Sequence, residues 1–167
     1  MSLKYLPEHA QATLLALDLA RKEAEHLRYS QSTLFELPID LDWVQALGNR
    51  PEVAEKVEAF VSRFGRLQDH LGEKLLPRFA ALVGENCKTL LDALAIAEKT
   101  DLLVSADAFI AARKLRNALV HEYMHDARTF LESLFAAQQA CNMLFAVIEK
   151  AEAEIHRLGV PKTGPFV

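Results

Sequence analysis

The sequence has few of the residues that interrupt helices or cross-link chains. It contains 6 glycines, 6 prolines and 2 cysteines among 167 residues, whereas 51% of its residues are hydrophobic. Such a chain is long enough to bury a core, and it favours one compact, helix-rich domain over a disordered chain. Cys87 and Cys141 fall in or directly beside segments predicted to be helical, so we interpret them as small apolar residues rather than as a disulfide.

Long apolar runs and a basic overall charge are also missing. The first residues, Met1 to Tyr5, lack the apolar stretch of a signal peptide, and no run approaches the roughly 20 apolar residues of a membrane span. We therefore expect a cytoplasmic protein without membrane contact. The formal net charge of −4 excludes a surface that is basic all over. Any contact with nucleic acid must be local, and the run from Arg113 to Arg128 is locally basic.

Common motifs for nucleotide, metal and serine chemistry are absent from the sequence. There is no G-x-x-x-x-G-K-[ST] run and no G-x-G-x-x-G run, so no glycine-rich loop is available to hold phosphate. No local pattern indicates a serine nucleophile. His121 and His125 have the spacing of a helical metal pair, but a predicted break between them argues against a metal site. We expect no metal and no cofactor.

The periodicity of apolar residues predicts the fold class. We expect an all-α, antiparallel (up-down) bundle of four to five helices over residues 1–167, with a core over about 8–158 and a mobile tail over 159–167. Residues 29–41 are predicted to be a connector. The expected helical segments are 8–27, 41–47, 51–83, 88–99, a segment from Ser105 to a break at 123–126, and a last one capped by Asp126 or Thr129 that ends near 158.

The second long helix, over residues 51–83, is predicted to be kinked. Pro77 must kink it or end a segment, because proline lacks the N–H donor and collides with the preceding turn. Gly65 and Gly72 allow a neighbouring helix to approach closely, or allow bending. The polar residues of this helix include Asp69 and His70, and most of them are expected to face solvent.

One short run concentrates polar side chains within this apolar scaffold. Arg113, Asn117 and His121 follow one another at i, i+4 and i+8, on one stripe of a helix. Arg116 and His121 are five positions apart, which turns them roughly 140° away from each other on an ideal helix. One chain therefore brings Arg116 and His121 together poorly unless the helix ends near Val120. Two chains that each present this edge would bring them together well.

The side chains of this run suit one reaction. A histidine such as His121 can exchange a proton at cellular pH, and Arg116 offers a charged fork of donors to a phosphate. Asn117 adds donors and an acceptor for orientation. Together they suit phosphodiester cleavage by a ribose 2′-hydroxyl, which needs a base, an acid and stabilisation of an anionic phosphorane, but no metal. The alternative is structural, because arginine and histidine are common near helix ends.

The pattern Arg116-Asn117-x-x-x-His121-x-Tyr123 resembles the R-x4-H-x-Y signature of the HEPN superfamily. It is most similar to the HepT type, the toxin half of HEPN/MNT toxin–antitoxin pairs, and the resemblance covers about residues 8–158. It implies an up-down helical bundle, a homodimer with the motif at the dimer cleft, and metal-independent ribonuclease activity. It also implies an MNT-type nucleotidyltransferase antitoxin as partner, which in this family can add AMP to the motif tyrosine.

The expected function is therefore that of a HepT-like toxin that cleaves RNA. The alternative is a non-catalytic module that serves as partner subunit of a separate nucleotidyltransferase; the acidic net charge favours it, whereas the intact pair of Arg116 and His121 favours the enzyme. The candidate residues are Arg116 and His121 as catalytic residues, Asn117 and Arg113 as orienting residues, Tyr123 as AMP acceptor or substrate-positioning residue, and Asp69 and His70 as second choices.

Overall fold

The computed structural model describes residues 4–123 and 125–162, and every regular element in these two ranges is helical. The all-α class predicted from the sequence is confirmed. The elements are η1 (Pro7–His9), α1 (Ala10–Leu34), α2 (Leu41–Gln45), η2 (Leu47–Asn49), α3 (Pro51–His70), η3 (Leu71–Leu75), α4 (Leu76–Leu82), α5 (Leu90–Lys99), α6 (Ala106–Glu122) and α7 (Ala127–Arg157).

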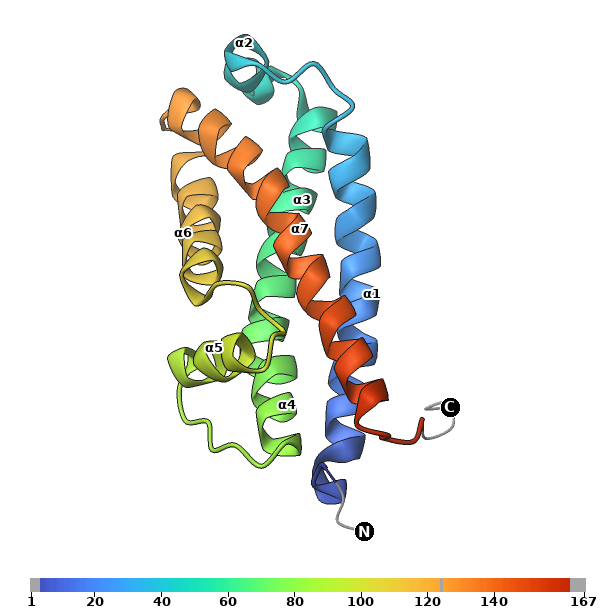
Figure 1. Cartoon of the computed structure of the whole chain (residues 1–167). Helices are drawn as coiled ribbons and strands as arrows, with labels where there is room; N and C mark the ends of the chain where they lie inside the picture. Colours follow the sequence, from blue (N-terminus) through green and yellow to red (C-terminus); the bar gives the residue numbers. More distant parts are fainter. Residues whose placement is uncertain (1–3, 124, 163–167) are drawn as a thin grey trace.

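Three long helical columns carry the core. α1 lies beside the column formed by α3, η3 and α4, and α7 runs obliquely across them (Figure 1). α6 packs on α7 and α3, while α5 packs on α4 and α6. The largest fully buried side chains are phenylalanines from α3, α4, α6 and α7, so one hydrophobic cluster joins these helices. They are Phe60, Phe64, Phe79, Phe109 and Phe130.

α1 is longer than the sequence predicted. We expected it to end near Leu27 because serines follow, but it continues to Leu34. The hydroxyl of Ser32 donates to a carbonyl of the preceding turn, and the buried Ser30 accepts a hydrogen bond from Arg63 of α3 at 2.8 Å. The connector predicted after Leu27 was therefore wrong over its first part, because these hydroxyls bond within the helix or across to α3.

A π-helical turn, Leu71–Leu75, interrupts the second long helix just before Pro77. The wider turn accommodates the missing N–H and the ring of proline, and Pro77 becomes an early residue of α4. The expected interruption is thus present, and α4 continues the course of α3 (Figure 1). A Cβ at Gly72 would lie 2.9 Å from Leu90 and 3.6 Å from the ring of Phe109. Gly72 therefore lets α5 and α6 approach closely, as predicted.

The two cysteines lie in different surroundings. Cys87, which we expected in or directly beside a helix, lies in the loop before α5, whose start is set by a capping box of Thr89 and Asp92. Cys141 is fully buried in α7, and burial raises the pKa of its thiol to about 12. Both cysteines are free thiols. The helix predicted next to Cys87 was begun too early, because the capping box begins it only at Leu90.

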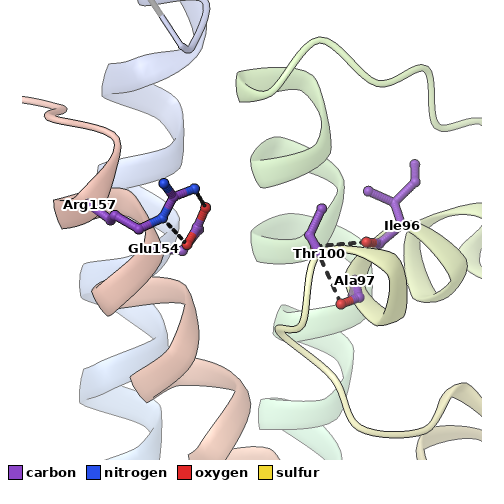
Figure 2. Close-up of polar contacts among 5 residues, drawn as sticks. All are labelled: Ile96, Ala97, Thr100, Glu154 and Arg157. Carbon is purple, nitrogen blue, oxygen red and sulfur yellow. Dashed lines mark hydrogen bonds and ion pairs between the residues drawn. The ribbon is translucent and has the colours of Figure 1, made fainter.

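Side chains form hydrogen bonds near the C-terminal ends of α5 and α7 (Figure 2). The Thr100 hydroxyl donates to the carbonyl oxygens of Ile96, at 2.7 Å, and Ala97, at 3.3 Å, and these oxygens also accept the backbone N–H groups of Thr100 and Leu102. Near the end of α7, the guanidinium of Arg157 grips the Glu154 carboxylate with two hydrogen bonds, and this pairing holds the pKa of Glu154 below its usual range.

The core continues past α7. Gly159 adopts a φ of 80°, the left-handed conformation that ends helices, and returns the chain toward the core. Val160 is then buried. The tail predicted from residue 159 therefore begins too early, because Val160 packs against the cluster. The prediction for residues 163–167 lies outside the described residues.

α7 is the one helix in the described ranges that is long and apolar enough to cross a membrane by length and composition. In its most apolar window, of mean hydropathy 1.2, 44% of the residues are buried inside the structure. Its buried residues contact α1, α3 and α6. Packing in the core thus accounts for much of its apolar character.

Candidate functional site

α6 carries the polar run and holds it as one uninterrupted helix. Ser105 caps its start, as predicted, because its hydroxyl accepts a hydrogen bond from the backbone N–H of Ala108 at 3.1 Å. The helix continues through His121 to Glu122, so it does not end near Val120. Arg116 and His121 therefore keep the roughly 140° divergence of an ideal helix. One chain does not bring them to the same phosphate.

An ion pair and close packing hold Arg116 against α3. Its Nη1 donates to Oδ1 of Asp69 at 2.6 Å, and the two side chains are 36% and 33% exposed. Nε of Arg116 occupies the space that a side chain at position 65 would need, since a Cβ added to Gly65 would lie 2.6 Å from this nitrogen. Asp69, a second choice from the sequence, is thus the direct partner of the motif arginine.

Arg113 approaches the same carboxylate from one turn earlier in α6. Nη1 of Arg113 is 3.7 Å from Oδ1 of Asp69. This Nη1 nitrogen is buried, and none of the residues that the structure describes forms a hydrogen bond with it. Gln68 is fully buried beside the pair, and its amide donates to the carbonyl oxygen of Ala112 at 3.1 Å. The α3–α6 contact therefore places two guanidinium groups beside one carboxylate.

Asn117 and His121 point away from this contact. Both side chains are exposed on the outer stripe of α6. His121 lies in the last turn of the helix, where the helix dipole favours positive charge. The structure therefore separates the predicted set into an inner group, Arg113 and Arg116 with Asp69, and an outer group, Asn117 and His121. The outer group is open to a substrate or to a second chain.

Tyr123 follows α6 directly and stands at the rim of a groove. Its ring meets Phe130 edge to face, with centroids 5.3 Å apart. The groove, of about 270 Å³, lies between α3 and α6, and Val120 at its edge is 59% exposed. Partial burial, and then the charge of Glu58, raise the pKa of the Tyr123 phenol. The groove is lined by Val57, Glu58, Val61, Ser62, Leu119, Val120 and Tyr123.

The predicted break follows the motif, although Met124 lies outside the described residues. Asp126, one of the two expected caps, begins α7: its carboxylate accepts from the backbone N–H of Thr129 at 3.1 Å and from its hydroxyl at 2.9 Å. These hydrogen bonds hold the pKa of Asp126 below its usual range. The alternative cap, Thr129, was wrong because Thr129 serves as the donor to Asp126.

One further candidate, His70, lies away from the inner group. Nε2 of His70 lies 2.7 Å from the carbonyl oxygen of Ala16, so this histidine contacts α1 rather than α6. Among the residues that the structure describes, no group of three or more histidine, cysteine, aspartate or glutamate side chains could hold a metal ion.

Sequence reasoning missed Gln68, one of the polar residues of the second long helix, most of which we expected to face solvent. Its position relative to Phe64 and Leu71, four residues before and three after, puts it on the buried face. That spacing was visible in the sequence. Its buried amide shows that the α3–α6 interface is polar where the arginines cross it.

Comparisons with protein-family models, curated proteins and solved structures gave no match. Any functional assignment therefore depends on the residues of this chain, their geometry and the resemblance of the motif.

Proposed function

We propose that this chain is a HepT-like member of the HEPN superfamily that cleaves RNA without a metal ion, in the cytoplasm, as an up-down helical bundle that pairs with a second copy. An MNT-type nucleotidyltransferase antitoxin neutralises it. The observation that carries the proposal is the arrangement of α6. This helix holds Arg116 at the surface of α3 and leaves His121 exposed, in the R-x4-H-x-Y spacing.

The proposed reaction is attack of a ribose 2′-oxygen on the adjacent phosphorus. His121 accepts the proton of the 2′-hydroxyl as the new O–P bond forms. The bond from phosphorus to the 5′-oxygen breaks, and a protonated histidine of the second copy supplies the proton to that oxygen. Arg116 stabilises the charge on the phosphorane, and Asn117 orients the phosphate. The products are a 2′,3′-cyclic phosphate and a 5′-hydroxyl.

The experiment that tests the ribonuclease is incubation of the purified protein with end-labelled RNA, with and without EDTA. We expect cleavage in both, and 2′,3′-cyclic phosphate ends, because charge is stabilised by Arg116 and the nucleophile belongs to the RNA. A substrate with deoxyribose at the cut site should remain intact. Cleavage that stops in EDTA, or that proceeds at deoxyribose, would contradict the proposal.

A two-fold dimer is the first prediction, because Arg116 and His121 diverge within one chain. An isologous contact at the edge that includes Val120 would cover this exposed side chain and let Arg116 of one copy meet His121 of the other. We expect sedimentation of a dimer at micromolar concentration, and a monomer without cleavage activity for Val120→Asp. The matched control is Val104→Asp: Val104, in the turn before α6, is 80% exposed, and this variant should stay dimeric. A monomeric wild type would argue strongly against the composite site.

Modification of Tyr123 is the second prediction. Its phenol oxygen would attack the α-phosphate of ATP, and pyrophosphate would leave. A tyrosine phenol keeps its proton near neutral pH, and burial raises the pKa of Tyr123 further, so the partner enzyme must supply the base. AMP on Tyr123 would add a bulky anion to the motif, and its negative charge would oppose the binding of RNA phosphate.

The measurement is intact mass after incubation with the nucleotidyltransferase and ATP, and we expect an increase by one or more AMP units. Tyr123→Phe should abolish the increase. Tyr29→Phe, which changes a tyrosine that is 66% exposed on α1, should leave it unchanged. Modification that persists in Tyr123→Phe would assign the acceptor to another residue.

The second candidate function is a non-catalytic partner subunit of a separate nucleotidyltransferase. The net charge of −4 and the pairing of Arg116 with Asp69 favour it, because both weaken attraction of RNA. This function predicts a stable complex with the nucleotidyltransferase, no RNA cleavage, and no toxicity when the chain is expressed alone.

A further inference from the structure

We infer that Asp69 is a positioning residue that sets the direction of the Arg116 guanidinium, and that Gly65 leaves the space in which this guanidinium lies. This inference rests on the proposed ribonuclease function. It adds that α3 determines where the motif arginine of α6 can meet a phosphate.

The first step is the use of the arginine donors. Arginine carries five N–H donors in one plane. In the ranges that the structure describes, only Nη1 of Arg116 donates to a protein group, the carboxylate of Asp69 at 2.6 Å. The ion pair therefore fixes one corner of the guanidinium and leaves other donors for a phosphate. Asp69 orients the group without occupying the whole of it.

The second step is steric. A Cβ at position 65 would lie 2.6 Å from Nε, 3.0 Å from Cζ and 3.1 Å from Cδ of Arg116. Real Cβ atoms essentially never approach another atom as closely as 2.6 Å, so with a larger residue at position 65 the end of the Arg116 side chain would have to move away from α3. A free arginine samples many rotamers, and holding it in one of them before substrate arrives favours the productive geometry.

The third step is the charge of the cluster. Arg113 and Arg116 together carry two positive charges, and Asp69 neutralises one of them. Removing the carboxylate charge leaves both guanidinium groups without this counter-ion. Binding of RNA and turnover should then change in opposite directions, because RNA is attracted more strongly while Arg116 is held less well. A residue that merely supports the fold would not separate these two quantities.

The experiment compares two substitutions in the full chain. Asp69→Asn keeps the shape and removes the charge; Asp69→Glu keeps the charge and moves it. For Asp69→Asn we expect kcat to fall about ten- to a hundred-fold. KM should be unchanged or lower, and the salt dependence of RNA binding should steepen by about 0.7, the value for one more phosphate contact on a single strand. Asp69→Glu should also lower kcat, but the salt dependence of RNA binding should stay at the wild-type value.

The space left by Gly65 is tested by Gly65→Ala. We expect kcat to fall although Asp69 is intact, because the new Cβ displaces Arg116. Gly48→Ala is the matched control, since a Cβ at Gly48 meets nothing within 4 Å. Asp107→Asn, an exposed aspartate in the first turn of α6, controls for the change in net charge.

A measurement without RNA separates this inference from the ribonuclease proposal. Phenylglyoxal modifies arginine, and peptide mass spectrometry gives the rate at Arg116. We expect Arg116 to react slowly in the wild type relative to the exposed Arg128, and several-fold faster in Asp69→Asn and Gly65→Ala. If the wild type does not cleave RNA, the ribonuclease proposal fails, and these rates alone then decide whether Asp69 and Gly65 hold Arg116.

Two results would overturn the inference. One is an Asp69→Asn variant with wild-type kcat and an unchanged modification rate at Arg116. The other is an Asp69→Asn variant in which kcat and melting temperature fall together while KM, salt dependence and modification rate stay the same. The second result would make Asp69 a residue of the fold only.

Discussion

Replacing His121 by alanine is expected to slow RNA cleavage by about two to four orders of magnitude, the usual contribution of general acid–base catalysis. In the proposed dimer, the substitution removes both the base that takes the 2′-hydroxyl proton and the acid that protonates the leaving oxygen. His121 is exposed at the end of α6, so little packing is lost. The melting temperature should barely change, and single-turnover cleavage of labelled RNA gives the rate.

The matched control for this variant is His125→Ala. His125 is also exposed, and it lies beyond the end of α6. Its loss should leave the rate within a few-fold of wild type. A His121→Ala variant that keeps full activity but melts at a much lower temperature would make His121 a structural histidine. The partner-subunit function would then be the better description.

Replacing Arg116 by alanine should lower kcat by about two to three orders of magnitude, like removal of an oxyanion donor. Arg116 also packs along α3, so we expect a small fall in the melting temperature, which His121→Ala should not show. The ion pair itself adds little, because partly exposed pairs contribute about 0–1 kcal/mol and solvent screens them. In the Arg116→Ala variant, Arg113 still lies 3.7 Å from the Asp69 carboxylate and balances its negative charge.

Arg116→Lys tests whether the fork of donors or the charge alone is needed. Lysine keeps the positive charge but offers no planar pair of donors to a phosphate. We expect RNA binding near the wild-type level with kcat still reduced at least about tenfold. Arg50→Ala, which removes an exposed arginine just before α3 and outside the basic run, serves as the control. If Arg116→Ala cleaves RNA at the wild-type rate, charge stabilisation must come from another residue.

The individual helices, and the residues that begin or interrupt them, could largely be predicted from the sequence. Apolar spacing gave the second long helix and α7, and local signals gave the cap at Ser105 and the interruption near Pro77. These depend on neighbours within one or two turns. The end of α1 was misjudged because the hydrogen bond from Arg63 to Ser30 joins residues 33 positions apart. A contact at that separation leaves no trace in local spacing.

In the candidate site, too, local features could be predicted from the sequence, whereas contacts between distant residues could not. Spacing along α6 predicted that Arg116 and His121 diverge, and the continuous helix keeps this divergence. The partner of Arg116 could be named only as a second choice, because Asp69 is 47 positions away. Gly65 was recognised as a place where a helix could approach closely. That an arginine side chain fills this space depends on how α6 crosses α3, and only the tertiary structure sets that crossing.

The π-helical turn Leu71–Leu75 changes the directions in which the side chains of the second long helix point after it, relative to those before it. Upstream of it, α3 turns Asp69 toward α6; downstream, α4 turns Phe79 into the core. Each residue rotates a regular α-helix by about 100°, so in a regular α-helix of the same sequence the extra residue held by the π turn would rotate α4 against α3 by about that angle. Phe79 could not then be buried while Asp69 still faced Arg116. The widened turn therefore lets one helix serve two faces that a regular α-helix of the same sequence could not align together.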